Sequence, residues 1–171
     1  MLAFPIFYLK LLIMQGVFMK TIMMNMVRIF DNDGRVVVLD KKKVYGWEGL
    51  TFPGGKVEPF ESFDDAAIRE VKEETNLDVK DLEFNGIIQW LYTSDNSRYV
   101  GLLYTSKKYS GQLIEENKEG KLFFEDYEKF KKMEGHSWSM KYLLDIFDGK
   151  FFEITLTFDD DNELKEVKRI K

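Results

Sequence analysis

The sequence of 171 residues contains no cysteine and only one histidine, His136. Without cysteine the chain has no disulfide, no thiolate metal site and no thiol nucleophile. A single histidine also excludes a zinc site built from several imidazoles. Any metal must therefore be held by oxygen ligands, which favours Mg²⁺, Mn²⁺ or Ca²⁺.

The chain also lacks a basic segment, and its formal net charge at pH 7 is -5. Proteins that grip long DNA or RNA neutralise phosphates with Lys and Arg, so we expect no long nucleic acid as a partner. A small phosphorylated substrate remains compatible with this charge, because a bound metal supplies positive charge locally. We expect a cytoplasmic protein, and the sequence leaves open whether it forms a homodimer.

Residues 1–18 are almost wholly apolar and carry Lys10 in their middle. The segment has neither the leading positive charge nor the small cleavage-site residues of a signal peptide. It is marginal in length for a membrane span, and Lys10 would lie near the bilayer centre, so a membrane is not the expected partner. We expect an apolar extension upstream of the domain, with a packing or oligomerising segment as the alternative. Residues 19–171 are expected to form a single domain.

Strand-like and helix-like segments alternate from Lys20 onward. Segments rich in branched and aromatic residues flank turn sequences and predict three hairpins, over 21–42, 82–109 and 150–170. A short apolar strand is expected at 49–52. Helical spacing appears at 62–75, 124–133 and 137–147. This order predicts an α+β fold, with a mixed β-sheet in an α/β/α sandwich.

The helix predicted at 62–75 carries three carboxylates, Glu70, Glu73 and Glu74, at positions i, i+3 and i+4. Residues with this spacing share one helix face, where like charges repel one another. The opposite side holds Ala67, Ile68, Val71 and Thr75, which are expected to pack on a sheet. We therefore expect the acidic face to be turned away from the core and available to divalent cations.

A capping box is expected to begin this helix, and an arginine is expected to hold its carboxylates in place. Ser62 is a suitable N-cap, and Asp65 three residues later completes a capping box. Arg69 lies among Asp65, Glu73 and the preceding Glu61, and its guanidinium can hold carboxylates by charge-assisted hydrogen bonds.

The full spacing is specific. Gly55 is followed by five residues, Glu61, seven residues and then the run Arg69 to Glu74. Such a pattern arises by chance in a chain of this size with odds of about 1 in 100,000. The segment resembles the Nudix box, G-x5-E-x7-R-E-U-x-E-E-x-G-U, in which U is apolar. Asn76 replaces the last glycine, at a position after the helix end where a left-handed residue is needed and asparagine is tolerated.

The resemblance implies the Nudix fold and Mg²⁺-dependent hydrolysis, with Mn²⁺ as a possible substitute, of a nucleoside diphosphate linked to another moiety. It implies Glu70, Glu73 and Glu74 as metal ligands together with the Gly54 carbonyl. It also implies that Glu61 and Arg69 organise the cluster.

In MutT-like enzymes a KEG tripeptide before a short strand supplies a loop glutamate. Glu119 resembles it and becomes a candidate catalytic residue and metal ligand. The general base is then either a box glutamate or Glu119, and an ordinary loop carboxylate is the alternative for Glu119.

The second half resembles the MutT/MutX group of oxidised-purine nucleoside triphosphatases, through GIIQW, EGKLFF, LLDIF and KFFEITLTF. In that group a Trp and an Asp before the last helix contact the purine. Met133 and His136 stand in those places here, and Trp138 can stack on a base. The resemblance implies a small nucleotide substrate, a purine nucleoside triphosphate cleaved to the monophosphate and pyrophosphate, with a reduced preference for 8-oxo-dGTP.

Two alternatives remain open at this stage. One is hydrolysis of another nucleoside diphosphate derivative, and the other is a non-catalytic nucleotide-sensing module. Because every box glutamate is present, we favour an enzyme.

Overall fold

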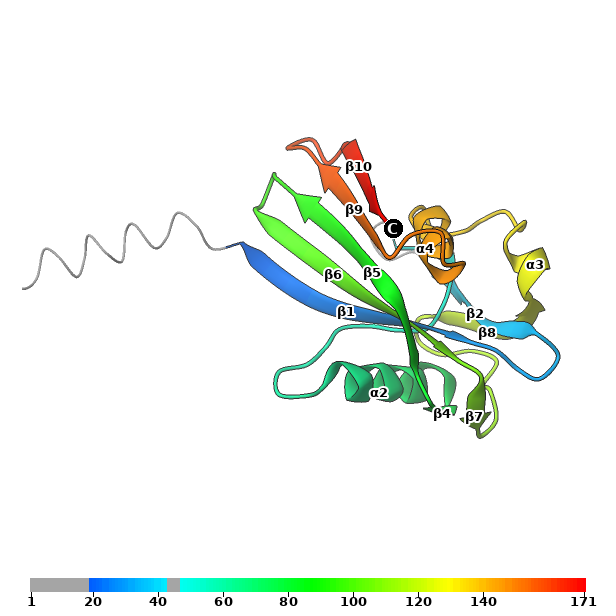
Figure 1. Ribbon diagram of the computed structural model, residues 1–171. Helices are drawn as coiled ribbons and strands as arrows, with labels where there is room; N and C mark the ends of the chain where they lie inside the picture. Colours follow the sequence, from blue (N-terminus) through cyan, green and yellow to red (C-terminus); the bar gives the residue numbers. More distant parts are fainter. Residues whose placement is uncertain (1–18, 43–46) are drawn as a thin grey trace, which may run out of the picture.

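A computed structural model describes residues 19–42 and 47–171, so the predicted extension at 1–18 lies outside the described residues. The main sheet has the strand order β1-β6-β5-β9-β10. These strands are β1 (Lys20–Ile29), β6 (Ser97–Ser106), β5 (Glu83–Tyr92), β9 (Glu153–Phe158) and β10 (Leu164–Ile170). The pairs β1–β6 and β5–β9 are parallel and the other two are antiparallel, which makes the sheet mixed (Figure 1).

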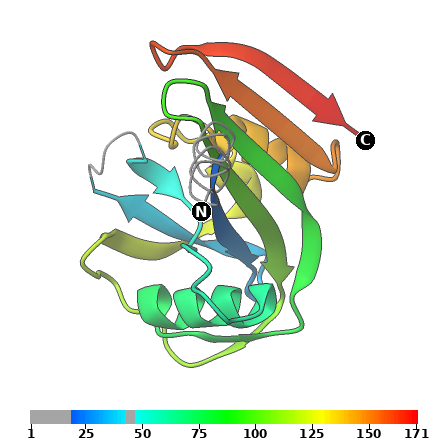
Figure 2. The ribbon, with the colours of Figure 1, turned by 90° about the vertical axis from the view of Figure 1, so that its left-hand side faces the viewer.

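A second, antiparallel sheet has the order β3-β2-β8 and lies beside the main sheet (Figure 2). Its strands are β3 (Gly49–Thr51), β2 (Arg35–Lys41) and β8 (Gly120–Asp126). Two short strands, β4 (Asp78–Lys80) and β7 (Lys108–Ser110), form a further antiparallel pair.

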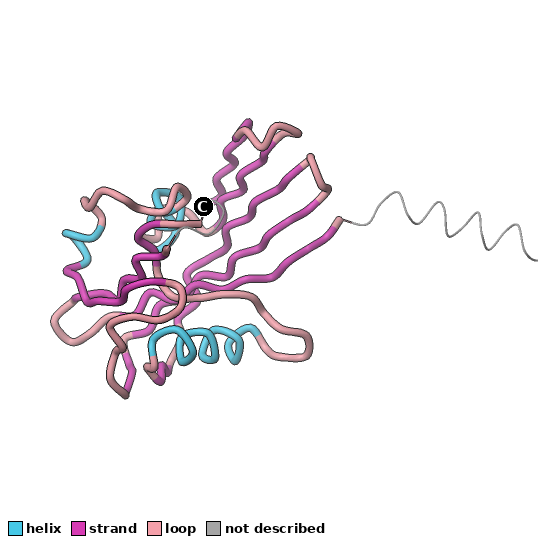
Figure 3. Tube along the Cα trace, turned by 180° about the vertical axis from the view of Figure 1, so that it is seen from behind, coloured by secondary structure: helices cyan, strands magenta, loops and turns pink. Residues whose placement is uncertain are grey.

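The helices cover opposite faces of the main sheet. Helix α2 (Phe63–Thr75) packs on one face, whereas α3 (Tyr127–Phe130) and α4 (Met140–Phe147) lie on the other (Figures 1 and 3). Neighbouring β6 residues divide accordingly, because Leu102 joins the α2 cluster and Leu103 joins the α4 cluster. This alternation confirms the predicted α+β fold with a mixed sheet between helices. Within the described ranges, no helix has both the length and the apolarity needed to cross a membrane.

Two of the predicted hairpins are confirmed, β5–β6 and β9–β10. The first predicted hairpin, over 21–42, is wrong beyond its turn. The Asp31 N–H donates to the Arg35 carbonyl at 2.9 Å, but β1 then pairs with β6 while β2 pairs with β3 and β8. The reason is that β2 is buried on both faces, with Val36 and Val38 in one core cluster and Val37 and Leu39 in the other.

The helix predicted at 124–133 is confirmed only over the four residues of α3. Strand β8 continues to Asp126 because Phe123 and Phe124 pair with Val38 and Val37 of β2. Only the four residues of α3 are helical, after the Asp126 side chain accepts the Lys129 N–H at 2.8 Å. The helix predicted at 137–147 is shorter than expected and begins at Met140.

Candidate functional site

Helix α2 begins and ends as its sequence predicts. The Ser62 hydroxyl accepts the Asp65 N–H at 3.1 Å and donates to the Asp65 carboxylate at 2.7 Å. At the other end Asn76 adopts a left-handed conformation with φ 63°, and its N–H donates to the Lys72 carbonyl at 3.0 Å. The left-handed position predicted for Asn76 is therefore confirmed.

The division of α2 into an acidic face and a packed face needs two corrections. Ile68 is 38% exposed, and Ala66 is buried in its place. Glu74 was expected to point away from the core but is only 5% exposed. The reason is a loop that covers this end of the helix, from which the Gly54 N–H donates to the Glu74 carboxylate at 2.9 Å.

That loop runs along the free edge of β1. The Val27 N–H donates to the Pro53 carbonyl and the Asn25 N–H to the Gly55 carbonyl, both at 2.8 Å. A Cβ on Gly54 would lie 2.7 Å from the Met26 Cα, at a φ of 151°, so this close approach requires glycine. A Cβ on Gly55 would meet the Glu70 carboxyl at 2.5 Å. The two glycines thus allow both carboxylates to reach the backbone of the loop.

Arg69 joins the helix to the segment before it. Its Nε and Nη2 donate to the two oxygens of Glu61 at 3.1 and 2.7 Å, and its Nη2 also donates to the Lys56 carbonyl at 3.0 Å. Its Nη1 donates to Glu70 at 2.9 Å and lies 3.6 Å from Glu73. The hydrogen bonds from Arg69 hold the pKa of Glu61 below its usual range. Arg69 therefore fixes two carboxylates at once, while Asp65 contacts Ser62 instead.

Glu119 lies beside the buried carboxyl of Glu74. Burial, together with the charge of Glu119, raises the pKa of Glu74 to about 8 against the lowering effect of the Gly54 N–H. Glu119 is itself partly buried, but its ion pair with Lys41 at 2.7 Å and a hydrogen bond with Glu74 lower its pKa overall. The opposite shifts in pKa favour a proton on Glu74 rather than on Glu119.

Asn117, which was not predicted as a site residue, positions Glu119. Its Nδ2 donates to the Glu74 carbonyl at 2.8 Å, and its Oδ1 accepts the N–H groups of Glu119 and Gly120 at 2.7 and 2.9 Å. Asparagine side chains commonly accept the backbone N–H two residues further on, so an asparagine two residues before Glu119 was the available signal.

These residues suit a hard cation. Across residues 19–42 and 47–171, no three acidic or histidine side chains already form a metal-binding group. Glu70 and Glu74 nevertheless meet the same glycine loop, and Glu119 adjoins Glu74. A buried pair of carboxyls that holds a proton can exchange it for a cation, and carboxylate oxygens are what Mg²⁺ prefers. Glu73 differs from them, since its side chain is 61% exposed.

A cavity of about 490 Å³ lies next to this acidic group. The main sheet forms one wall, and β3 with the segment before α4 forms another. Its lining includes Met24, Asn25, Met26, Trp47, Thr51, Phe52, Trp90, Tyr99, Gly101, Leu103, Ser137, Ser139 and Leu143. Gly54 and Lys41, which contact Glu74 and Glu119, also line it. The acidic group and the cavity therefore form one continuous site.

The residues proposed to contact a base lie elsewhere. Met133, His136 and Trp138 do not line this cavity, whereas Ser137 and Ser139 do. His136 bridges Leu50 of β3, whereas Trp138 and Ser139 lie in the turn that leads into α4. The pattern alone could not tell which of these side chains face the cavity.

The three residues have other surroundings. The His136 ring packs on Phe130 with centroids 4.7 Å apart, and burial lowers its pKa despite a hydrogen bond with the Phe130 backbone. Trp138 is 39% exposed and packs edge-on against Tyr142 and Phe158. Met133 packs against the α4 core cluster.

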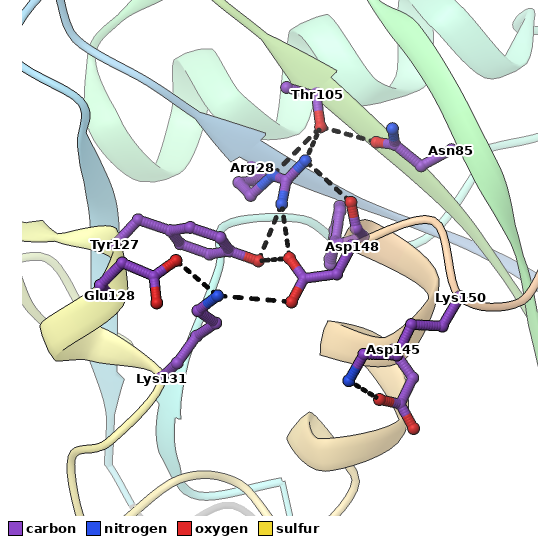
Figure 4. A network of polar contacts seen from close by, with 10 residues as sticks. Arg28, Asn85, Thr105, Tyr127, Glu128, Lys131, Asp145, Asp148 and Lys150 are labelled. Atoms are coloured by element: carbon purple, nitrogen blue, oxygen red, sulfur yellow. Dashed lines mark hydrogen bonds and ion pairs between the residues drawn. The ribbon is translucent and has the colours of Figure 1, made fainter.

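A buried arginine holds the α3–α4 segment against the main sheet (Figure 4). Arg28 of β1 donates to the Thr105 and Tyr127 hydroxyls at 3.1 and 2.8 Å, and to the Phe147 carbonyl at 3.0 Å. Tyr127 donates in turn to Asp148 at 2.6 Å. The network contacts both ends of the segment that includes the cavity residues Ser137, Ser139 and Leu143 and so fixes that wall. Arg28 was not among the residues predicted from the sequence, although a charged residue inside an apolar strand was the available signal.

Comparisons with known proteins agree with this geometry. The family described as NUDIX domain matches residues 19–153. The chain is 30% identical over 101 residues to YvcI of Bacillus subtilis (strain 168), an uncharacterized Nudix hydrolase, covering 57% of this chain and 62% of that protein. It is 60% identical over 38 residues, 22% of this chain and 24% of the relative, to YtkD of the same organism, which carries the provisional name 8-oxo-dGTP diphosphatase. The chain thus spans less than two thirds of the length of these relatives.

A solved structure has the same fold. The MutT protein of Bacillus halodurans superimposes with a TM-score of 0.72 and 22% identity, covering 86% of this chain and 97% of that chain.

Proposed function

The chain belongs to the NUDIX domain family, and from this premise we propose that it is a Mg²⁺-dependent hydrolase that converts a nucleoside triphosphate into the monophosphate and pyrophosphate. We further propose that it acts on free nucleotides in the cytoplasm. The proposal joins the family to one observation in this chain, the continuity between a carboxylate group and an apolar cavity.

That continuity rests on Gly54 and Lys41. Each lines the cavity and each contacts a carboxylate, Gly54 through its N–H to Glu74 and Lys41 through its ion pair with Glu119. A nucleotide has the matching layout, with an apolar base at one end and a polyanion at the other. A base in the cavity would direct its phosphates toward the carboxylates.

The residues have separate roles in the proposed reaction. Glu70, Glu74 and Glu119, together with the Gly54 carbonyl, would hold the cation, and Glu73 is a further ligand at the exposed end of the same face. Mg²⁺, or Mn²⁺, when bound would neutralise the diphosphate and lower the pKa of a water molecule. Arg69 and Glu61 keep Glu70 in place.

The bond changes follow from this arrangement. The water oxygen forms a new bond to phosphorus while the bond between that phosphorus and the bridging oxygen breaks, and pyrophosphate leaves. The water proton passes to a carboxylate, for which Glu74 and Glu119 are the two candidates. Lys41 beside Glu119 offers a positive charge toward the leaving phosphates.

For the base we propose a purine, with 8-oxo-dGTP among the substrates and only a moderate preference for it. The name carried by YtkD supports the oxidised purine. The lining of the cavity supports the moderate preference, because Ser137 and Ser139 offer neutral hydroxyls where a carboxylate would accept ring N–H groups more strongly.

The test is hydrolysis by the purified full chain with Mg²⁺ against dGTP, 8-oxo-dGTP, ATP, ADP-ribose and a dinucleoside polyphosphate. We expect pyrophosphate from the purine triphosphates, and a kcat/KM for 8-oxo-dGTP within about 100-fold of that for dGTP. Glu74→Gln is the inactive control. Pyrophosphate from no triphosphate would contradict the proposal, and nucleotide binding without turnover would indicate a sensing module instead.

A further inference from the structure

The side chain of Trp90 in β5 carries a buried hydrogen-bond donor, its indole N–H. The residue lines the cavity and is only 3% exposed, and its indole Nε1 finds no acceptor among the described residues. An indole N–H can only donate a hydrogen bond, and burying it without an acceptor costs free energy. Most buried donors in folded proteins are paired, so an unpaired donor on a residue that lines a cavity points to a partner from outside the chain.

The ring is also fixed in position. Trp47 packs edge-on against it with centroids 5.2 Å apart. On another side the indole lies against Gly101, where a Cβ would come within 3.1 and 3.3 Å of two of its ring carbons. An indole held on two sides cannot readily rotate to find an acceptor within the protein, so its donor is preorganised.

We propose that the Trp90 indole N–H determines base specificity by donating a hydrogen bond to an exocyclic carbonyl oxygen of an oxo-purine. This inference rests on the proposed function, because it places the base in the cavity. The unpaired donor of Trp90 favours a carbonyl, since an adenine amino group at the same place would set one donor against another.

Discrimination between bases with and without this carbonyl then follows from the single donor of Trp90. A guanine-type base that presents a carbonyl satisfies the buried donor, whereas a base without it leaves the donor unpaired. Loss of such a hydrogen bond lowers affinity about ten-fold. Ser137 and Ser139 in the same cavity can contact the remaining polar edge of the base.

The first test observes the indole directly. The full chain contains three tryptophans, so ¹⁵N-tryptophan labelling gives three side-chain N–H signals. Trp90→Phe and Trp138→Phe each remove one signal and so assign all three. On titration with dGMP in the absence of metal, we expect the Trp90 signal to shift downfield. The 2-aminopurine analogue, which lacks the carbonyl, should leave it nearly unmoved and bind about ten-fold more weakly. Equal shifts and equal affinities for the two nucleotides would overturn the inference.

The second test is kinetic and compares dGTP with the triphosphate of 2-aminopurine. In the wild type we expect kcat/KM to favour dGTP by about ten-fold, through KM. In Trp90→Phe, which retains an aromatic ring, the ratio should fall to about one with little change in kcat for dGTP. The matched control is Trp138→Phe, because Trp138 lies outside the cavity, and it should keep the wild-type ratio.

The two proposals fail separately. If the ratio of kcat/KM for dGTP to kcat/KM for the 2-aminopurine triphosphate is the same in wild type and in Trp90→Phe, the inference is wrong while the proposed function stands. If no triphosphate is hydrolysed, the proposed function is wrong, and the titration with dGMP still decides whether Trp90 binds the carbonyl.

Discussion

The acidic face of α2 and the wall of the cavity contrast in how they are built. The α2 site lies within a short stretch of sequence, from Glu61 to Asn76, and its caps, spacing and Arg69 clamp are local. The cavity instead gathers residues from β1, β3, β5, β6 and the segment before α4. Local spacing predicts which residues carry chemistry, whereas a cavity depends on contacts that are distant in sequence. Substitutions that separate catalysis from base binding test this contrast.

Glu74→Gln should have the largest effect. We expect turnover to fall by about 100-fold or more, because the substitution removes a charged ligand and a candidate base. Glu73→Gln is the matched control on the same helix face and should cost less, since Glu73 is 61% exposed. Steady-state kinetics with Mg²⁺ and dGTP measure both, and a larger loss for Glu73→Gln would show that the site is centred elsewhere.

Stability of the metal-free protein should change in the opposite direction to activity. Burial raises the pKa of Glu74 to about 8, well above its usual range, so the folded state favours the protonated form. That stabilisation is complete below the unfolded pKa and is lost as pH rises through about 8. Relative to wild type, Glu74→Gln should therefore gain melting temperature as pH increases from 5 to 8, as thermal denaturation in a metal chelator would measure. A gain that shrinks with increasing pH would contradict the buried protonated carboxyl.

Arg69→Lys should reduce kcat by about 10-fold with a small effect on KM. Lysine keeps the charge but cannot hold both oxygens of Glu61 while also contacting Glu70. In a Mg²⁺ titration, the variant should need a higher Mg²⁺ concentration than wild type to reach half of its maximal activity. If Arg69→Lys matches wild type at all Mg²⁺ concentrations, positive charge alone suffices and the bidentate geometry is dispensable.

Ser139→Val tests the cavity without touching the carboxylates. The Ser139 side chain makes no capping hydrogen bond to α4 and is 1% exposed, so a larger apolar side chain would intrude on the cavity. We expect KM for dGTP to rise about 10-fold with kcat within a few-fold of wild type. Ser62→Val, at the α2 cap far from the cavity wall, should leave KM unchanged. An effect of Ser139→Val on kcat alone would place the base elsewhere.

Asn76 should give the smallest change in activity. Asn76→Gly is expected to stay within a few-fold of wild type, because both residues adopt the left-handed conformation seen at φ 63°. Asn76→Val should destabilise the protein by about 1 kcal/mol or more, since a β-branched residue resists positive φ. Urea denaturation measures the difference, and a neutral Asn76→Val would show that this cap contributes nothing to stability.

Particular residues show how far prediction reached. The Ser62 cap, the left-handed Asn76 and the contact of Arg69 with Glu61 depend on residues in α2 or directly next to it, and all three were predictable. The burial of Glu74 was not, because it results from the Gly54 loop pairing with β1. Likewise the first hairpin was mispredicted because a local turn gives no information on which distant strand each arm will pair with.

The sequence by itself determined the chemistry available to this protein: oxygen ligands only, a Nudix box with all its glutamates, and an α+β order of elements. Only the tertiary structure decided that Ser137, Ser139 and Trp90 line the cavity while His136 and Trp138 do not. The physical reason is that a cavity forms between elements that are distant in sequence. Residues 136–139 form a short bridge and turn before α4, and the packing of β3, β5 and β6 around them sets which of their side chains face the cavity.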